Sequence, residues 1–314
     1  MTGPGRREVE HEITVRAPAA TAYRLIAEVA EWPRIFPPTV HVDHLERAPG
    51  HERIRIWATA EGEAKTWTSR RVLDPGGLRI EFRQEVSAPP VASMGGAWVI
   101  EPVGEDESRI RLLHDYRAVG DDPDDLAWID RAVDHNSRAE LAALKVNMER
   151  AVDSADLLLS FEDTVRIAGS AKDAYDFVND AHLWRERLPH VARVSLTEET
   201  PGLQTLEMDT RTKDGSTHTT RSVRVCFPHQ RIVYKQIVTP ALMTLHTGAW
   251  LFTDTGDGVT VTSRHTVMIN PDTITKVLGE GAGVAEAREF VRTALSGNSL
   301  ATLGHARAYA ESRA

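Results

Sequence analysis

Residues 64–73 have the pattern of a strand that carries a cationic side chain beside a tryptophan. Side chains alternate along a strand, so Trp67, Ser69 and Arg71 share one face. If that face points into the protein, a guanidinium lies in an apolar interior, where an unpaired charge is costly unless it binds a partner. Arg71 is therefore a candidate for binding an anionic oxygen. The opposite assignment, with Val72 inward and Arg71 in solvent, fits the alternation equally well.

A histidine lies on the apolar face of another predicted strand, residues 108–118. Ile110, Leu112, His114 and Tyr116 alternate with charged residues, which places His114 inside. An imidazole titrates near neutral pH and can accept or donate protons. A hydrogen-bonded core histidine is the alternative. The same alternation, with an inward His265, recurs in the second half of the chain.

Several large side chains fall where they would line a cavity near Arg71. They are Trp32, Phe36, Trp67, Met94 and Trp98. Each alone fits an ordinary core, because aromatic residues dominate cores. The chain has no phosphate-binding glycine loop, no paired metal-ligand spacing and no nucleophile elbow. We therefore predict neither a cofactor nor a metal.

The candidate residues recur after about 152 positions, which indicates a duplicated domain. The matched segments are Ala22-Tyr23 with Ala174-Tyr175, Trp32 with Trp184, Pro37 with Pro189, Ser69 and Arg71 with Ser222 and Arg224, and Gly96-Ala97-Trp98 with Gly248-Ala249-Trp250. Asn136-Ser137 matches Asn298-Ser299 at a larger offset. Extra residues are therefore expected before the last helix of the second copy.

Each copy has the elements needed to position these side chains. In the first copy we predict a strand over 9–15, a helix over 19–30 that ends at Trp32-Pro33, six strands over 42–46, 52–60, 64–73, 78–86, 97–102 and 108–118, and a long amphipathic helix over 125–151 that starts after an acidic run. Such a set closes by wrapping a curved antiparallel sheet around the long helix, which leaves a cavity between them. The fold class is α+β. The predicted domains are 1–153 and 160–314, joined by a short apolar linker that favours packing of the two domains.

Composition limits the function classes. The 314 residues are 41% hydrophobic and 26% charged, as in an ordinary globular protein, and the single cysteine, Cys226, excludes an internal disulfide. The net charge is -9 and no basic block occurs, which argues against nucleic-acid binding. The polar start and the absence of a long apolar run argue against a signal peptide and a membrane span, so we expect a cytoplasmic protein with no membrane partner.

Three segments carry a resemblance to a known family. They are Trp32-Pro33-Arg34-Ile35-Phe36-Pro37-Pro38, Trp67-Thr68-Ser69-Arg70-Arg71 and the run from Val91 to Trp98. With them the chain resembles the polyketide aromatase/cyclases, helix-grip proteins related in fold to START and birch-pollen-allergen domains. These enzymes act in bacterial type II aromatic polyketide pathways. The tandem arrangement resembles the two-domain branch, which implies closure of the first ring, carbon 7 to carbon 12, on a chain reduced at carbon 9.

The resemblance also implies roles for residues. Arg71 matches the pocket arginine, Ser69 and Trp67 match its strand neighbours, and His114 matches a histidine implicated in dehydration. The implied pocket walls are Trp32, Phe36, Met94 and Trp98, to which we add Tyr116 as a substrate contact. The second copy keeps Ser222, Arg224, His265, Trp184 and Trp250, but Thr220 replaces Trp67 and His246 replaces Met94.

The implied reaction is an intramolecular aldol condensation followed by loss of water. Arg71 would bind a developing enolate or alkoxide, Ser69 would hold a water molecule, and His114 would move protons. The expected partners are an acyl carrier protein that bears the chain, contacted by a basic rim at Arg34, Arg53 and Arg55, the minimal polyketide synthase and a ketoreductase. A binding module for hydrophobic ligands and a chaperone that only steers spontaneous cyclisation are the alternatives.

Overall fold

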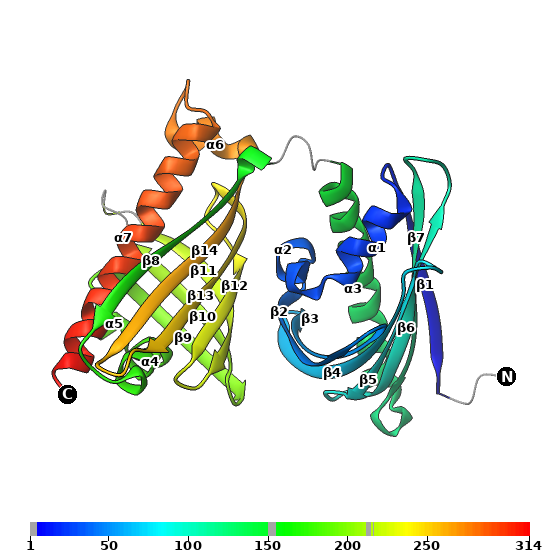
Figure 1. The fold of residues 1–314 in the computed structure, drawn as a ribbon, viewed down its shortest axis with the longest axis horizontal. Helices are drawn as coiled ribbons and strands as arrows, with labels where there is room; N and C mark the ends of the chain where they lie inside the picture. The colour runs from blue at the N-terminus through cyan, green and yellow to red at the C-terminus, as the bar shows by residue number, and fades with distance from the viewer. Residues whose placement is uncertain (1–4, 150–154, 212–214, 216) are drawn as a thin grey trace. The chain divides into compact units, whose positions relative to one another are not determined.

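Each half of the chain folds into a seven-stranded antiparallel sheet that curves around one long helix (Figure 1). The computed structural model describes residues 5–149, 155–211, 215 and 217–314. The chain divides into two units, Met1–Asp153 and Ser154–Ala314. The predicted α+β class, a pair of helix-grip domains, is confirmed.

The first unit follows the predicted order of elements. Its elements are β1 (Arg7–Val15), α1 (Ala19–Ala27), η1 (Val29–Glu31), α2 (Trp32–Ile35), β2 (Thr39–Ala48), β3 (His51–Ala60), β4 (Glu63–Asp74), β5 (Arg79–Val86), β6 (Val91–Pro102), β7 (Ser108–Ala118), η2 (Val119–Asp121) and α3 (Pro123–Glu149). The sheet order is β1-β7-β6-β5-β4-β3-β2. Only β1 is out of sequence order, because it pairs with the last strand.

The second unit repeats this arrangement. Its elements are η3 (Ala155–Leu157), β8 (Leu158–Ile167), α4 (Ala171–Asn179), η4 (Ala181–Leu183), α5 (Trp184–Arg187), β9 (Val191–Thr200), β10 (Leu203–Arg211), β11 (Thr217–Phe227), β12 (Arg231–Val238), β13 (Met243–Asp254), β14 (Val259–Ile269), η5 (Pro271–Thr273), α6 (Ile274–Leu278) and α7 (Val284–Glu311). The sheet order is β8-β14-β13-β12-β11-β10-β9. The extra residues expected before the last helix form η5 and α6.

Three predicted boundaries are wrong. Pro33 does not close a helix: α1 ends at Ala27, and the proline lies in the first turn of α2, where its missing N–H costs no hydrogen bond. Strand β6 begins at Val91 rather than 97, so the segment before Gly96 belongs to the sheet. Strand β8 begins at Leu158, inside the predicted linker. The predicted helix end near Ala151 lies outside the described residues.

The long helix of each unit closes the core. Helix α3 buries Ile129, Val133, Leu141 and Leu144, and it packs against β1 and β7. The carboxylate of Asp122 accepts hydrogen bonds from the backbone N–H groups of Asp124 and Asp125, which caps the helix at the predicted acidic run. Helix α7 packs in the same way against β8 and β14. The concave face of each sheet therefore faces its helix across the interior.

Candidate active site

The inward face of β4 carries the predicted trio. Ser69 and Arg71 are 3% and 2% exposed, whereas Val72 is 40% exposed. Trp67, Ser69 and Arg71 all line a cavity in the interior of the first domain. Of the two assignments that alternation allowed, the structure therefore has the one with Arg71 inside.

Arg71 has a partner that the sequence analysis missed. The β3–β4 register places Glu52 opposite Arg71, and Nη1 of Arg71 donates to Glu52 Oε1 at 2.6 Å. The guanidinium also donates to the carbonyls of Ala27 and Ile26 at the end of α1, and it lies 4.9 Å from the ring centroid of Trp32. The protein itself thus supplies the partner that a buried guanidinium requires. The sequence does contain a signal for this partner: Glu52 lies two residues before Ile54, so the two share the inward face of their strand.

These contacts hold Arg71 in one position and leave it charged. Burial lowers its pKa to about 10, so the side chain remains a cation at neutral pH. A guanidinium has five N–H groups, and the contacts to Glu52, Ala27 and Ile26 use three of them. Two N–H groups are left for other acceptors.

Two hollows of about 150 and 100 Å³ share several lining residues and form the cavity of the first domain. The predicted wall residues Trp32, Phe36, Trp67, Met94 and Trp98 all line it. Their rings pack against one another: Phe36 stacks on Trp98 with centroids 6.0 Å apart, and Trp32 meets Phe36 edge-on at 5.4 Å. Aromatic rings therefore form much of the cavity wall, which suits a ligand with a ring system.

Tyr116, a predicted substrate contact, lies elsewhere. Its ring is 1% exposed and packs with Ile129 and Val133 of α3, and its hydroxyl donates to Asp130 Oδ1 at 2.5 Å. It is not among the residues that line the cavity. In this structure Tyr116 holds β7 to α3, and the geometry gives no support to a substrate contact.

His114 faces the cavity from β7, in a row that crosses three strands. Gly96 lies between Phe82 and His114 in the sheet register. A Cβ at Gly96 would lie 1.8 Å from the carbonyl oxygen of Leu113 and 2.8 Å from the Phe82 ring, so only glycine fits. The Phe82 ring meets the imidazole edge-on at 5.4 Å. Burial lowers the pKa of His114 to about 4, which keeps the imidazole neutral at pH 7. Its Nδ1 has no partner among the described residues.

Glu140 on α3 is a second acid that the sequence analysis missed. Its side chain lines both hollows, as does His114. Burial raises the pKa of the carboxyl to about 8, and no hydrogen bond or ion pair links it to the part of the chain that the structure describes. The sequence does contain a signal for this acid. Asn136-Ser137 recurs in the second copy, and Glu140 follows Asn136 by four residues, so it lies on the same side of the helix as that repeated pair.

The second domain has its own cavity, of about 120 Å³. All five residues predicted from the repeat line it: Trp184, Ser222, Arg224, Trp250 and His265. The two replacements, Thr220 and His246, line it as well. The Arg224 side chain is 2% exposed, and its Nη2 donates to the carbonyl of Val178 at 2.7 Å.

A hydrogen-bonded network surrounds His265. Its Nδ1 lies 3.2 Å from the Tyr234 hydroxyl and 2.9 Å from Nε2 of His246. Its Nε2 lies 3.0 Å from the hydroxyl of Ser263 and 2.8 Å from that of Ser299. Burial lowers the pKa of His265 to about 4 and that of His246 to about 3, so both rings are neutral. Tyr234 reaches His265 across Gly248, where a Cβ would lie 2.4 Å from the phenol.

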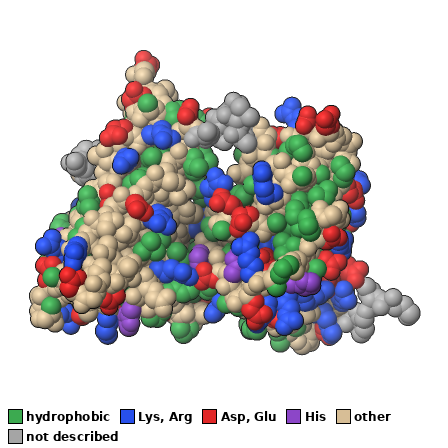
Figure 2. All heavy atoms as spheres, in the orientation of Figure 1, with side chains coloured by type: hydrophobic (Ala, Val, Ile, Leu, Met, Phe, Trp, Pro, Cys, Tyr) green, Lys and Arg blue, Asp and Glu red, His purple; other side chains and the backbone are tan. Residues whose placement is uncertain are grey.

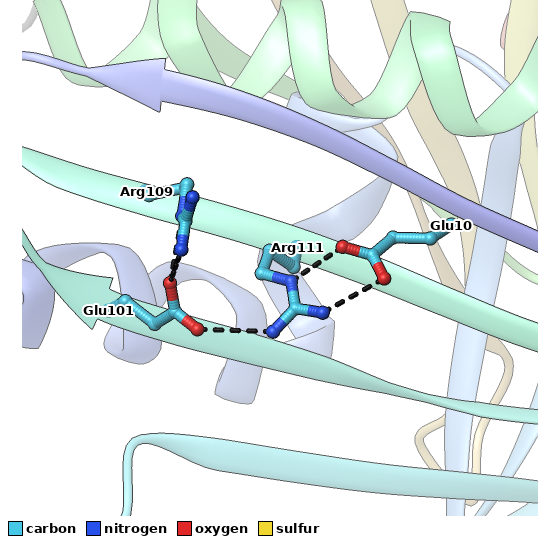
Figure 3. A network of polar contacts seen from close by, with 4 residues as sticks. All are labelled: Glu10, Glu101, Arg109 and Arg111. Atoms are coloured by element: carbon cyan, nitrogen blue, oxygen red, sulfur yellow. Dashed lines mark hydrogen bonds and ion pairs between the residues drawn. The ribbon is translucent and has the colours of Figure 1, made fainter.

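The outer face of the first sheet is polar, and its charges are paired. Arg111 on β7 bridges Glu10 and Glu101, and Glu101 also binds Arg109 (Figure 3). Acidic and basic side chains are interspersed on the face drawn in Figure 2. The opposite face of β7 carries Ile110, Leu112 and Tyr116, which are buried, and His114 lies in the same alternation.

The three arginines proposed for a basic rim differ in their contacts. Arg34 pairs with Glu31 at 2.5 Å, and Arg53 pairs with both Glu46 and Glu85. Arg55 lies 5.1 Å from the ring centroid of Trp57. Two of the three charges are therefore already compensated within the protein. Their role in docking a carrier protein stays a prediction.

The described residues contain neither a membrane-spanning helix nor a cluster of metal ligands. Within the described ranges, no helix is both long and apolar enough to cross a membrane. Across the same residues, no group of three His, Cys, Asp or Glu side chains is arranged to hold a metal ion.

Both halves match one protein family. A family model described as "Polyketide cyclase / dehydrase and lipid transport" matches residues 6–149 and again residues 159–311. The two matches correspond to the two sheets and their helices.

Full-length relatives resemble the whole chain. The granaticin polyketide synthase bifunctional cyclase/dehydratase of Streptomyces virginiae is 54% identical over 297 residues, which cover 94% of this chain and 97% of that protein. The actinorhodin polyketide synthase bifunctional cyclase/dehydratase of Streptomyces coelicolor is 50% identical, with 99% of each chain covered.

Two solved structures share the two-domain arrangement. The di-domain ARO/CYC BexL from the BE-7585A biosynthetic pathway is 67% identical with a TM-score of 0.86, and the match covers 97% of this chain and 99% of that one. The di-domain ARO/CYC StfQ from the steffimycin biosynthetic pathway is 38% identical with a TM-score of 0.85 over the same shares.

Proposed function

The chain belongs to the polyketide cyclase/dehydrase family, and from that premise we propose that it closes and aromatises the first ring of a carrier-bound poly-β-ketone. The new bond joins carbon 7 to carbon 12 of a chain already reduced at carbon 9. At the coarser level the chain is a cyclase/dehydratase enzyme of type II polyketide synthase pathways. The observation that carries the assignment of this chemistry to the first domain is the neutral acid and neutral base, Glu140 and His114, in one aromatic cavity. The position of the ring and the reduction at carbon 9 rest on the resemblance to the two-domain branch of the family.

The first step forms the carbon–carbon bond. His114 takes a proton from a CH2 group of the chain, and the enolate carbon that forms attacks a ketone carbon of the same chain. The ketone oxygen becomes an alkoxide, which takes the proton back from His114. The aromatic walls formed by Trp32, Phe36 and Trp98 hold the chain in place. Holding two reacting carbons in contact can lower a barrier by about 7–11 kcal/mol. The N–H groups that Arg71 does not use for Glu52 and α1 are available to the enolate or alkoxide oxygen, with Ser69 beside them.

The second step removes water. The hydroxyl left by the first step departs with a proton from Glu140, whose pKa of about 8 keeps the carboxyl protonated at pH 7. His114 takes the proton from the neighbouring carbon, and the freed electron pair forms the new double bond. The imidazole is uncharged before this step, as its lowered pKa requires. Return of the proton from His114 to Glu140 restores both groups. The same couple then removes the hydroxyl at carbon 9, with a proton from a neighbouring carbon, as a second molecule of water. The ketone that remains in the ring enolises, and the ring is then aromatic.

The substrate arrives on an acyl carrier protein, after the minimal polyketide synthase and a ketoreductase have acted. The relatives from Streptomyces virginiae and Streptomyces coelicolor are each a bifunctional cyclase/dehydratase by name. One cavity that holds both a positioned arginine and an acid–base couple is consistent with both activities. This supports assigning both steps to the first domain.

The test reconstitutes the full-length protein with the minimal synthase and ketoreductase and follows products by chromatography and mass spectrometry. Glu140→Gln should lower the rate of aromatic product formation by about a hundredfold, with accumulation of the cyclised but hydrated compound. Glu149→Gln is the matched control, because Glu149 lies on the same helix but pairs with Lys145 outside the cavity. An unchanged product rate in folded Glu140→Gln protein would favour a binding or chaperone role, in which shape alone matters.

A further inference from the structure

The two buried arginines have different partners across the sheet. In the first domain, β3 sets Glu52 opposite Arg71, and the two side chains form an ion pair. In the second domain, β10 sets Gln204 opposite Arg224. The side chains of Gln204 and Glu52 have the same length, but the amide of Gln204 carries no charge. The positive charge of Arg224 therefore has no carboxylate in the position that neutralises Arg71.

The contacts of Arg224 leave one side of the guanidinium free. Nη2 donates to the carbonyl of Val178 at 2.7 Å, and the group lies 5.4 Å from the ring centroid of Trp184. Nη1 is buried and has no hydrogen-bond partner among the described residues. No salt bridge joins Arg224 to a carboxylate in that part of the chain. The side chain lines the cavity of the second domain.

Gln204 is engaged with other residues. Its amide nitrogen donates to Glu198 at 2.8 Å and lies 3.4 Å from the side-chain oxygen of Asn179. Its Oε1 has no partner within the described residues, and no hydrogen bond joins it to Arg224. The local structure thus holds the amide toward Glu198 and leaves Nη1 of Arg224 without an acceptor among the described residues.

We propose that the cavity of the second domain is a binding site for a flat ligand that carries an anionic oxygen, such as an enolate, phenolate or carboxylate. The oxygen accepts from Arg224 Nη1, and the ring system packs against Trp184 and Trp250. The hydroxyls of Tyr234 and Ser299 and the neutral imidazoles offer partners to further oxygens. A buried cation without a partner is costly, and an anionic ligand satisfies it. The ligand class rests on the proposed function, because enolic and phenolic rings are what a polyketide cyclase makes.

The test titrates the full-length protein with 1-hydroxy-2-naphthoate, a flat aromatic carboxylate, by isothermal titration calorimetry. Arg224→Gln should weaken binding by at least about tenfold, as expected for the loss of one charge-assisted hydrogen bond. Gln204→Glu should weaken it similarly while Arg224 is kept, because the new carboxylate neutralises the guanidinium. Arg193→Gln is the control: Arg193 is an exposed arginine of the same domain that pairs with Asp209, and its loss should not change the affinity.

The reciprocal substitution in the first domain tests whether the charge of the residue opposite the arginine controls anion binding. Glu52→Gln should free Arg71 in the first domain and add a second binding event in the same titration. Thermal unfolding confirms that each variant is folded. Unchanged affinity in folded Arg224→Gln and Gln204→Glu proteins would overturn the proposal. The readout is binding alone, so a failure of the proposed cyclisation chemistry in the first domain would appear only in the product assay, and the two failures are distinguishable.

Discussion

The two cavities are built on one plan but differ in how they treat charge. In the first domain Arg71 is neutralised by Glu52, and the one histidine, His114, shares its cavity with an unpaired acid, Glu140. In the second domain Arg224 has no carboxylate partner among the described residues, and its histidine lies in a network of hydroxyls and a second imidazole. The repeat kept the arginine and the histidine but changed what surrounds each of them.

A residue that recurs in both domains need not have the same role in both. An ion-paired guanidinium is a rigid positioning group with few spare donors, whereas an unpaired one attracts an anion. An isolated carboxylic acid with a raised pKa is a proton donor, and no such acid lines the second cavity, where Thr302 lies at the matching helix position. We therefore assign proton transfer, with transient hydrogen bonding of the reacting oxygen by Arg71, to the first cavity, and binding of a stably anionic ligand to the second.

Loss of the Glu52–Arg71 ion pair of the first domain, which has no counterpart among the described residues of the second, should change stability most. Glu52→Ala removes the partner of a buried arginine and should lower the free energy of unfolding of the first domain by about 3–5 kcal/mol. Gln204→Ala, the matched change, removes a neutral hydrogen-bonding group and should cost the second domain about 1 kcal/mol. Pulse proteolysis in urea, with fragments assigned to each domain by mass spectrometry, measures both.

A double variant gives the control for this pair. In Glu52→Ala/Arg71→Met the unpaired charge is gone, so part of the lost stability of the first domain should return. Equal losses from Glu52→Ala and Gln204→Ala would contradict the view that Arg71 is neutralised and Arg224 is not.

Much of the fold and part of this comparison could be predicted from the sequence. Strand alternation placed His114 and His265 on inward faces, and the repeat matched Arg71 with Arg224. Alternation allowed Arg71 to face either inward or solvent, and the burial of both arginines shows that they lie inside. Pro33 misled the helix boundary because proline is tolerated in a first turn as well as after a last one. Such local signals do not distinguish a helix end from a helix start.

The partners of the candidate residues could not be predicted in the same way. Whether Glu52 meets Arg71 depends on the β3–β4 register, which is set by the whole sheet. Glu140 lies among polar residues on the border of the apolar face of α3, and its raised pKa arises from burial against strands that are distant in sequence. The charge state of a site therefore depends on tertiary packing, and the residue pattern of a single strand does not predict it.

Raising the pH from 6.5 to 8 should lower the free energy of unfolding of the first domain. Burial raises the pKa of Glu140 from 4.5 to about 8, so its stabilising contribution is complete below pH 4.5 and is lost as the pH rises through 8. Burial lowers the pKa of His114 to about 4, so this group adds stability as the pH rises. Its effect is confined to pH values below about 6.5, where the imidazole of the unfolded chain binds a proton. Between pH 6.5 and 8 the loss amounts to at most about 2 kcal/mol.

The second domain should not follow this trend. The pKa values of His246 and His265 are about 3 and 4, so their contribution is complete once the pH exceeds about 6.5. Burial lowers the pKa of Lys235 from 10.5 to about 7, and this group adds stability as the pH rises further, because the unfolded lysine binds the proton that the folded one releases. Domain-resolved pulse proteolysis at both pH values checks this, and Glu140→Gln should flatten the slope of the first domain. Parallel slopes in the two domains would contradict the assignment.

The smallest expected effect concerns one hydroxyl. Tyr234 and Phe82 occupy the same position in the two domains, each across a glycine from the inward histidine. Tyr234→Phe removes the hydroxyl 3.2 Å from His265 Nδ1, but His246 still bonds that nitrogen, so the second domain should lose only about 0.5–1.5 kcal/mol. Phe82→Tyr should be neutral or slightly stabilising, because its hydroxyl can supply a partner to the unpaired Nδ1 of His114. Nitrogen chemical shifts of the two imidazoles would report the new bond directly. If Phe82→Tyr leaves the shifts of His114 unchanged while Tyr234→Phe alters those of His265, the two rows differ in ring orientation as well as in the hydroxyl.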